Sequence, residues 1–506
     1  MMKKAVVFIS NNDYMAMEEA MNRYQDGFEV FFVVCDKNVG VCHANYYGSK
    51  VYCKFCIYSM MKHITPLLKK DRERFHCVKM SELVTKNDVN TALKETFVYS
   101  TVDELKNIEY HDVEIGYGAF STYVSCSRNV MPNFTNELCN YLNMMMRAQI
   151  RMTLALERYL DNITPDLIVF HNGRFLNFKP WLCLAKKKCV DFVATETRRS
   201  TDDTMMKNNF FNEIPHSQEA FKIKTEKAWE KCGAVKGSEI GRQFFENRRK
   251  AKAAGDKVYT KSQEQGKLPE DFDYSKRNIA IFNSSEDEYF SISKEYDNAV
   301  LFPNQYTALK NIFEHYKDCE DLHFFLRIHP NLAKVPFKSH LMLYELKYDN
   351  VTIIPPQSPV SSYTLMGAVE KVIVFNSTMG LESSYWGKPV IALNRCFYSE
   401  YNIVHEPKTV SELYEMIDDK DLKCLKDEEA CYKLACFCMG YGVEDFKYYK
   451  NKLYDWHGFV YPWSKILGSS KLYRFVEYIL KRAICKYGGT KEYKLYIKNR
   501  TEIDKI

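Results

Sequence analysis

Short apolar runs of strand length recur along the chain, and longer polar or amphipathic stretches separate them. In the first half, an amphipathic stretch from Asn136 to Leu160 with the spacing of a helix lies between two pairs of such runs. Continuous apolar runs of this length are typical of strands buried on both faces of a parallel sheet. The runs predicted as strands in this half are Ala5 to Ile9, Phe28 to Val34, Leu167 to Phe170 and Phe192 to Thr195.

The second half shows the same alternation more regularly. Helical segments at Tyr306 to Tyr316, at Ser361 to Ala368 and after Thr378 separate the apolar runs, which indicates β-α-β units with parallel strands. We therefore predict an α/β fold with two Rossmann-like domains whose parallel sheets face a cleft. The strands predicted in this half are Asn278 to Phe282, His323 to Ile328, Val351 to Ile354, Val372 to Phe375 and Val390 to Leu393.

A polar, basic stretch from about Arg242 to Lys267 lacks strand patterning and ends at Leu268-Pro269. A chain of 506 residues exceeds the size at which one core stops growing, so this stretch is the best candidate for a connection between domains. We predict an N-terminal domain over residues 1–265, a C-terminal domain over residues 266–470 and a helical tail over residues 471–506.

Composition narrows the class of protein. Hydrophobic residues make up 46% of the chain and charged residues 27%, as in an ordinary soluble globular protein. A formal net charge of +6 is small for this length, so we expect no nucleic acid as a partner. No apolar run is long enough to span a bilayer, and the first residues lead into a predicted strand without a signal-peptide pattern. These features predict a cytoplasmic protein.

The most informative segment lies between the last two predicted strands. After Phe375 the chain reaches a small polar cluster, Asn376-Ser377-Thr378, and then a segment compatible with a helix. The start of a helix leaves backbone N–H groups unpaired, and the two hydroxyls add donors, so this turn suits an anionic group such as a phosphate. Glu382 follows one helical turn later and could accept hydrogen bonds from sugar hydroxyls. A capped helix in any α/β core would share this pattern.

A second predicted strand ends at another polar group. Leu322 to Ile328 carries Arg327 near its end and is followed directly by His329 and Pro330. Ligands collect at the carboxyl ends of the strands in such sheets, so Arg327 and His329 are expected on the same rim as Ser377. An imidazole at this place can donate to a phosphate oxygen or to a leaving oxygen. The residues predicted to bind the nucleotide are therefore Arg327, His329, Asn376, Ser377 and Thr378.

Three motifs follow one another in this region: Asn278-Ile-Ala-Ile-Phe-Asn-Ser-Ser-Glu-Asp-Glu288, Arg327-Ile-His-Pro-Asn331 and Phe375-Asn-Ser-Thr-Met-Gly-Leu-Glu382. Their order resembles that of bacterial surface and capsular polysaccharide glycosyltransferases of GT-B architecture. The His-Pro and Ser-Thr pairs are also similar to those of the GT-B sialyltransferases and Kdo transferases. The last motif, with the Gly-Lys-Pro that follows it, resembles the sugar-nucleotide 2-epimerases as well.

This resemblance covers residues 278 to 395 and implies the partners of the protein. The donor would be a nucleotide sugar, either a UDP-sugar or a CMP-sugar, and the acceptor a glycan or a lipid-linked glycan. No cofactor would be needed for catalysis. The resemblance further assigns Gly380 and Glu382 to the nucleotide site and Ser284, Ser285 and Glu286 to substrate binding.

The rim of the N-terminal sheet is expected to hold the acceptor. The predicted strand that ends at Phe170 is followed by His171-Asn172-Gly173-Arg174. Gly173 permits a tight turn, and Arg174 can pair with an anionic acceptor or with the donor phosphate. We therefore assign Asn172, Gly173 and Arg174 to substrate binding.

Transfer with inversion needs a general base that takes the proton of the acceptor hydroxyl. Glu196, Asp13 and His171 each follow a predicted strand of the N-terminal half and qualify by position. Glu196 is preferred, although carboxylates at such a rim are more often solvated or cap a helix. With His329 at the leaving phosphate, these residues form the predicted catalytic set.

The chain has 17 cysteines, which in a reducing compartment indicate thiols or metal ligands rather than disulfides. Cys53 and Cys56 have the two-residue spacing that lets both thiolates face one metal ion, and Cys35 and Cys42 precede them. These cysteines predict a structural zinc site, with chance clustering as the alternative. The spacings of an iron–sulfur cluster are tighter.

In the tail, an apolar stripe on a predicted helix is formed by Leu472, Phe475, Val476, Ile479 and Leu480. It is expected to pack back on the N-terminal domain. The alternative is peripheral contact with the inner face of a membrane, because Lys and Arg residues flank the stripe.

We predict a glycosyltransferase that moves a sugar from a nucleotide-sugar donor onto a bacterial surface polysaccharide of capsule or O-antigen type. One alternative is a sugar-nucleotide 2-epimerase or hydrolase of the same architecture, which needs no acceptor. Another is a catalytically silent scaffold of polysaccharide assembly.

Overall fold

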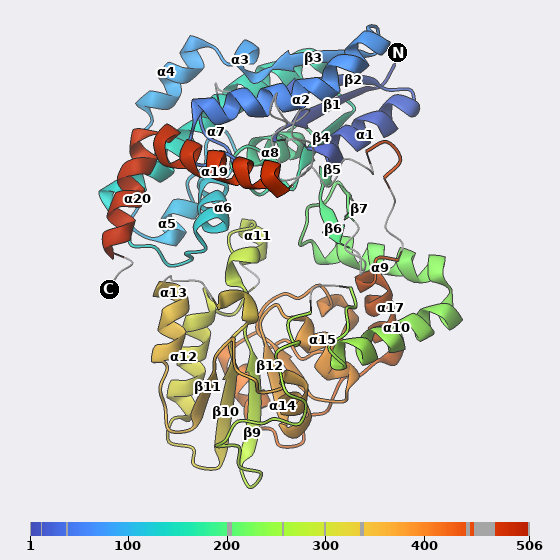
Figure 1. Ribbon diagram of the computed structural model, residues 1–506, viewed down its shortest axis with the longest axis vertical. Coiled ribbons are helices and arrows are strands. Elements are labelled where there is room, and N and C mark those ends of the chain that lie inside the picture. The colour runs from blue at the N-terminus through green and yellow to red at the C-terminus, as the bar shows by residue number, and fades with distance from the viewer. Residues whose placement is uncertain are drawn as a thin grey trace.

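The computed structural model describes residues 2–11, 13–36, 39–199, 205–255, 258–297, 300–333, 338–441, 446–449 and 471–503. It has two lobes, each built around its own sheet, with the N-terminal lobe at the top of Figure 1 and the C-terminal lobe below. The two Rossmann-like domains that the sequence predicts are therefore present, and they face each other as in the GT-B architecture.

The N-terminal sheet has the strand order β3-β2-β1-β4-β5-β8. All neighbouring strands pair in parallel except β5 and β8, which pair antiparallel. Along β1, Val6 and Phe8 face one core while Ala5, Val7 and Ile9 face the other, so the sheet is buried on both sides. The strands are β1 (Lys4–Ile9), β2 (Glu29–Val34), β3 (Phe75–Lys79), β4 (Leu167–His171), β5 (Asp191–Thr195) and β8 (Phe210–Phe211).

Helices cover both faces of this sheet, and a small two-stranded ribbon follows β5 (Figure 1). The longest helix, α7, is capped by the Thr135 hydroxyl, which accepts from the Leu138 N–H. The helices are α1 (Tyr14–Gln25), α2 (Lys50–Lys70), α3 (Met80–Leu83), α4 (Lys86–Lys94), α5 (Val102–Lys106), α6 (Ile115–Ser127), α7 (Asn136–Ile163) and α8 (Lys179–Lys187), and the ribbon is β6 (Thr197–Arg199) with β7 (Met205–Lys207).

The C-terminal sheet is entirely parallel and has the order β11-β10-β9-β12-β13. Its central strands lie between two apolar cores, with Ala280 and Phe282 on one side and Ile279 and Ile281 on the other. The strands are β9 (Arg277–Phe282), β10 (Leu322–Arg327), β11 (Val351–Ile354), β12 (Lys371–Val374) and β13 (Val390–Ala392).

The helices of this lobe connect successive strands and flank the sheet (Figure 1). The α-helices are α11 (Lys294–Asp297), α12 (Gln305–Tyr316), α13 (Lys338–Leu341), α14 (Ser362–Ala368), α15 (Thr378–Tyr385), α16 (Val410–Asp418) and α17 (Glu428–Cys438). Short 3-10 turns are η1 (Glu286–Glu288), η2 (Pro330–Leu332), η3 (Met342–Glu345) and η4 (Ser399–Tyr401).

The change of domain lies earlier in the chain than residue 265. Helices α9 (Gln218–Cys232) and α10 (Ala234–Arg249) pack beside α17 at the edge of the C-terminal lobe (Figure 1). Phe244, Phe245 and Ala254 belong to the same apolar core as β12. Two buried aromatic rings inside an otherwise basic stretch thus tie the predicted connection to the C-terminal domain.

After α17 the chain returns to the N-terminal domain. The Glu18 carboxylate accepts N–H groups of Lys447, Tyr448 and Tyr449 at 2.6–3.0 Å, and Tyr449 is part of the N-terminal core. Helices α19 (Lys471–Gly488) and α20 (Lys491–Ile503) then cross the upper lobe, where α19 lies beside α2 and α20 beside α7 (Figure 1).

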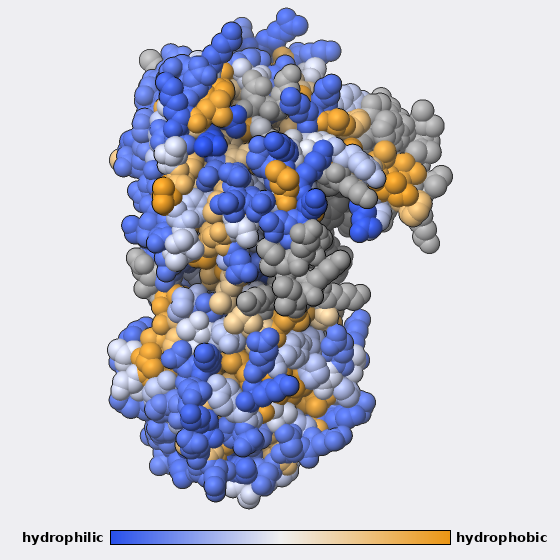
Figure 2. Space-filling view, turned by 90° about the vertical axis from the view of Figure 1, so that its left-hand side faces the viewer, coloured by the Kyte–Doolittle hydropathy of each residue, from blue (hydrophilic) through white to orange (hydrophobic). Residues whose placement is uncertain are grey.

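Within the apolar stripe predicted in the tail, Val476 and Leu480 are half-buried. Tyr496 of α20 is buried in the N-terminal core, whereas Phe475 and Ile479 of the stripe are 60% and 48% exposed. Hydrophilic residues cover most of the face drawn in Figure 2, with smaller apolar patches, several at the waist between the lobes. None of the helices in the described part of the chain is long and apolar enough to cross a membrane.

Candidate active site

The carboxyl ends of β10, β9 and β12 bring three of the predicted motifs together. Phe282 of β9 is paired with both Arg327 and Val374, so the loops that follow are neighbours. The His329 N–H donates to Asn283 Oδ1 at 2.7 Å, and the Asn376 N–H donates to Ser284 Oγ at 3.1 Å. The common rim expected for the motifs is therefore present.

The turn between β12 and α15 has the geometry of a helix N-cap. Ser377 Oγ accepts from the Met379 N–H at 3.2 Å, and α15 begins at Thr378. A Cβ at Gly380 would lie 2.1 Å from the Tyr398 hydroxyl, which donates to the Ser377 carbonyl at 2.6 Å. Gly380 is thus required because Tyr398 packs against the turn, and contact with a nucleotide remains a prediction for it.

Arg248 is a residue of this site that the sequence did not indicate. It comes from the last turn of α10, and its Nη2 donates to Thr378 Oγ1 at 3.1 Å while its Nε pairs with Glu382 Oε1 at 3.0 Å. Burial by itself lowers the pKa of Arg248, but the attraction of Glu382 and then of Tyr363 outweighs it, so the pKa lies above its usual value. A guanidinium therefore stands directly at the proposed phosphate turn.

The side chain of Glu382 is more buried than expected for a group that binds sugar hydroxyls. Its side chain is fully buried, with one oxygen bound to Arg248 and the other accepting from the Tyr363 hydroxyl. In this arrangement the carboxylate holds Arg248 in place. Contact between Glu382 and sugar hydroxyls remains a prediction, and it would require one of these partners to move.

His329 and Arg327 differ in how far they are available to a ligand. His329 is half-buried, and its Nδ1 accepts from the Asn331 N–H at 3.2 Å, so the neutral ring carries its proton on Nε2. Arg327 is 3% exposed and donates to the carbonyl oxygens of Pro355 and Ser358. Burial lowers the pKa of Arg327 to about 10. Its guanidinium stabilises the turn after β11, and its contact with a phosphate is untested.

Ser284, Ser285 and Glu286 follow β9 on the same rim. Ser285 is 4% exposed, and its hydroxyl has no hydrogen-bond partner among the described residues. The Glu286 Oε1 accepts from the Gln305 N–H at 2.7 Å. Burial raises the pKa of Glu286 to about 8, against opposing effects of the Gln305 N–H and Lys106. This carboxyl is therefore largely protonated at neutral pH.

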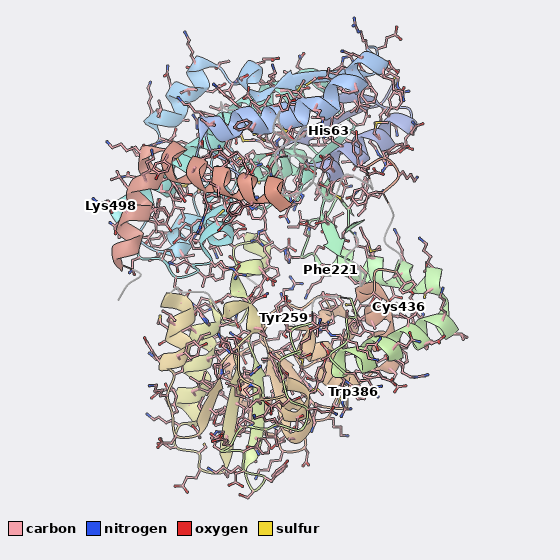
Figure 3. The ribbon with its side chains drawn as sticks, viewed as in Figure 1. His63, Phe221, Tyr259, Trp386, Cys436 and Lys498 are labelled. Atoms are coloured by element: carbon pink, nitrogen blue, oxygen red, sulfur yellow. The ribbon has the colours of Figure 1, made fainter. Side chains whose placement is uncertain are left out.

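Two cavities meet at the phosphate turn. One has a volume of about 280 Å³ and is walled by Phe221, Phe244 and Phe437 among others, while the smaller, of about 80 Å³, is lined by Tyr259 and His329. Arg248 and Thr378 line both cavities. Phe221 and Tyr259 are labelled in Figure 3, close to where the two lobes meet. A ligand phosphate at Thr378 could thus extend into an aromatic cavity on one side.

The residues proposed as general base gather at the rim of the N-terminal sheet. Glu196 and His171 both act electrostatically on Asp13, which places the three close together. Asp13 caps α1 by accepting from the Ala16 N–H, and burial raises its pKa while His171 lowers it. Glu196 accepts from Asn172 Nδ2 at 2.5 Å and from the Thr197 N–H at 2.9 Å. Which of them acts as a base is untested.

Arg174 reaches across to the other domain. Its Nη1 and Nη2 donate to the carbonyl oxygens of Glu288 and Asp287 at 2.6 and 3.3 Å, and it is 5% exposed. Burial lowers the pKa of Arg174 to about 10. Gly173 has a φ of +87° and Asn172 a φ of +56°, so the turn that presents Arg174 uses left-handed backbone, which Gly173 permits. Arg174 joins the domains here, and its pairing with an anionic ligand remains a prediction.

Two histidines that the sequence did not single out lie near Arg174. Burial lowers the pKa of His43 to about 3, with His171 and Arg174 adding to the effect. Burial also lowers the pKa of His216 to about 3, again with a contribution from Arg174. Both rings are therefore neutral at physiological pH.

The four N-terminal cysteines are close together, although they come from the end of β2, the following loop and α2. The Cys35 thiol forms a hydrogen bond with Cys42, which together with burial and the nearby Cys56 and Cys53 raises its pKa. Burial raises the pKa of Cys53 to about 12. No group of three or more His, Cys, Asp or Glu side chains within the described ranges is arranged to hold a metal ion. Zinc binding therefore remains a prediction.

Comparisons with known proteins give only distant similarities. No family model matches the chain, and no curated protein matches it. Among solved structures, it is similar to the Thermosulfurimonas dismutans β-Kdo 2,4-transferase KpsC, at 11% identity over 54% of this chain and 79% of that one, with a TM-score of 0.34. The S. aureus MnaA–UDP structure matches at 13% identity over 86% and 94%, with a TM-score of 0.26.

A third similar structure is the Streptomyces sp. SF2575 glycosyltransferase SsfS6 with thymidine diphosphate, at 10% identity over 87% of this chain and 96% of that one and a TM-score of 0.21. These scores are too low to support an assignment of activity.

Proposed function

We propose that the protein is a nucleotide-sugar-dependent glycosyltransferase that extends a bacterial surface polysaccharide of capsule or O-antigen type. The observation that supports this most strongly is the phosphate turn at Ser377 and Thr378, which lies beside His329 and Arg248 on a parallel rim that faces a second domain. Such a turn holds a phosphate, and the opposite domain leaves room for a second substrate.

The leaving phosphate gains negative charge as the glycosidic bond to the donor breaks. Arg248 and the start of α15 are placed to meet that charge, and His329 Nε2 can donate to a phosphate oxygen. The acceptor hydroxyl loses its proton at the same time, so a base is needed beside the bound acceptor.

The test is a panel of UDP-, CMP- and GDP-sugars incubated with the purified protein, with and without oligosaccharide acceptors. Nucleotide release that increases when acceptor is present is the expected result. Conversion of a UDP-sugar to its epimer, or nucleotide release that acceptor does not change, would favour the epimerase or hydrolase instead. Absence of nucleotide binding by calorimetry would contradict all of these activities and leave a scaffold role.

A further inference from the structure

Glu286 is held rigidly relative to the phosphate turn. Its Oε1 accepts from the Gln305 N–H at 2.7 Å, and Gln305 Oε1 in turn accepts from the Ser284 N–H at 3.0 Å. Ser284 Oγ accepts from the Asn376 N–H at 3.1 Å. A short series of hydrogen bonds thus connects the carboxyl of η1 with the residue that precedes Ser377.

A cavity of about 760 Å³ opens beside this carboxyl. Residues of both domains line it, and Glu286 is among them. Its volume lies within the range of about 300–1,000 Å³ that is usual for ligand sites. Tyr296 lines this cavity and also the cavity of about 280 Å³ at Thr378. A ligand in the larger cavity would therefore be a direct neighbour of a ligand at the phosphate turn.

The lining of the larger cavity suits a polyhydroxylated chain. Asn107 and Asn133 contribute exposed side-chain amides, which can both donate to and accept from hydroxyls. Phe134, Tyr289 and Phe302 contribute aromatic rings, which can pack on the C–H faces of sugar rings. The Lys106 ammonium is paired with Asp297 at 2.6 Å, so its positive charge is already balanced. This combination of amides and rings fits a glycan.

We infer that this cavity binds the acceptor glycan and that Glu286 is the general base for its hydroxyl. The inference rests on the proposed glycosyltransferase function and replaces Glu196 in that role. As the acceptor oxygen bonds to the anomeric carbon, its proton passes to the Glu286 carboxylate. The bond from the anomeric carbon to the donor oxygen breaks, and its electron pair leaves with the phosphate at Ser377 and Thr378.

The two carboxylates differ in how their oxygens are used. Both oxygens of Glu196 already accept hydrogen bonds, one from Asn172 Nδ2 and the other from the Thr197 N–H. Within the described part of the chain, only Oε1 of Glu286 accepts a hydrogen bond, from the Gln305 N–H, and the residue lines the cavity. Glu286 is therefore better placed to receive a proton from a bound hydroxyl.

The protonation of Glu286 gives this role a characteristic pH dependence. Lys106 and Asp287 are the charged groups that act on it most directly, and Lys294 and Asp297 line the same cavity. With its pKa raised to about 8 by burial, about a tenth of the carboxyl is ionised at pH 7 and about nine tenths at pH 9. A base must be ionised, so the transfer rate should rise by about tenfold between these pH values.

The experiment compares Glu286→Gln with Glu196→Gln and with the control Glu288→Gln, a neighbouring substitution at an exposed side chain in η1. Nucleotide release from the donor that the wild type uses is measured from pH 6 to pH 10, with the oligosaccharide panel present. We expect Glu286→Gln to lose about a hundredfold or more in rate and the rise toward pH 9, at unchanged nucleotide affinity by calorimetry. The control should keep the wild-type profile.

Thermal unfolding provides a readout that does not need activity. A folded-state pKa above the unfolded value makes wild-type stability fall as pH rises from about 4.5 to 8, and this fall should be smaller in Glu286→Gln, which stays neutral. Retention of the wild-type rate by Glu286→Gln would overturn the inference. If the wild type binds nucleotide but shows no turnover at any pH, the role of Glu286 is contradicted while the nucleotide site is retained. If the wild type binds no nucleotide, the proposed function is refuted as well.

Discussion

Replacement of Glu382 by Gln tests whether its carboxylate holds Arg248 at the phosphate turn. Gln keeps the shape of the side chain but removes its charge, so the Arg248 guanidinium would stay buried without a counter-charge. The two side chains are 0% and 15% exposed and their atoms are 3.0 Å apart, so solvent screens the pair little. Removal of one partner from such a pair costs about 3–5 kcal/mol.

Glu382→Gln should lie near the lower end of that range, at about 3 kcal/mol, because the amide oxygen can still accept from Arg248. For a domain of ordinary size this corresponds to a fall of roughly 10 °C in the unfolding midpoint. Since Arg248 also donates to Thr378, the affinity for a nucleotide should fall by about tenfold. Scanning calorimetry and titration calorimetry of the same preparation measure both effects.

Two controls distinguish the effect of an unpaired buried charge from the effect of removing a carboxylate in general. Glu264→Gln removes a carboxylate from an exposed pair with Lys267 at 2.9 Å and should change stability by less than about 1 kcal/mol. The double variant Arg248→Met with Glu382→Leu removes both charges and should unfold above Glu382→Gln, since no buried charge is left unpaired. A midpoint for Glu382→Gln within about 1 °C of the wild type would refute this account of the pair.

The remaining predictions concern the nucleotide, the base and the cysteines. Thr378→Ala and His329→Ala should each weaken nucleotide affinity by about tenfold to a hundredfold, and equal affinities in calorimetry would contradict the site. Glu196→Gln should keep near-normal transfer if Glu286 is the base, whereas a hundredfold loss at unchanged nucleotide affinity would assign the base to Glu196. Elemental analysis of the wild type should find one zinc ion per chain. The double variant Cys53→Ser with Cys56→Ser should lose this zinc and should be less stable to heat. Less than about a tenth of an equivalent of zinc in the wild type would exclude the site.

The sequence predicted the two sheets well because their strands are buried on both faces. Every strand predicted in the C-terminal half appears in the sheet, within one or two residues of the expected ends. The strand β3 was not predicted, since Phe75-His-Cys-Val-Lys79 combines polar and apolar residues. It lies at the edge of its sheet, where only β2 is a partner and a continuous apolar run is not required.

The site was predicted only where a motif directly follows a strand. The turn at Ser377 and the position of His329 follow from the carboxyl ends of β12 and β10. Arg248 could not be found in this way, because it lies 134 residues before Glu382 and on a different element. Its contact depends on α10 packing at the edge of the C-terminal sheet, which is a property of tertiary structure.

The segment from η1 to the end of α11 is bound by side chains of the N-terminal domain. Arg174 donates to carbonyls of η1, Arg128 pairs with Asp287 at 3.0 Å, and Lys106 pairs with Asp297. These cations all come from the N-terminal domain, while the segment they bind continues from β9, and Figure 1 shows α11 between the lobes.

Because of these contacts, residues 286–297, here called the wall, lie between the rim of β9 and the N-terminal domain and contact both. Glu286 is part of this wall and is among the residues that line the cavity that both domains form. The rim of β4 and β5, in contrast, meets the wall through Arg174, while Glu196 is bound to its own domain through Asn172 and Thr197. The hydrogen bonds through Gln305 and Ser284 hold Glu286 in place relative to the phosphate turn. These contacts lie within one domain, so they would be kept if the two domains moved apart. A base on the opposite domain would move away from the phosphate turn.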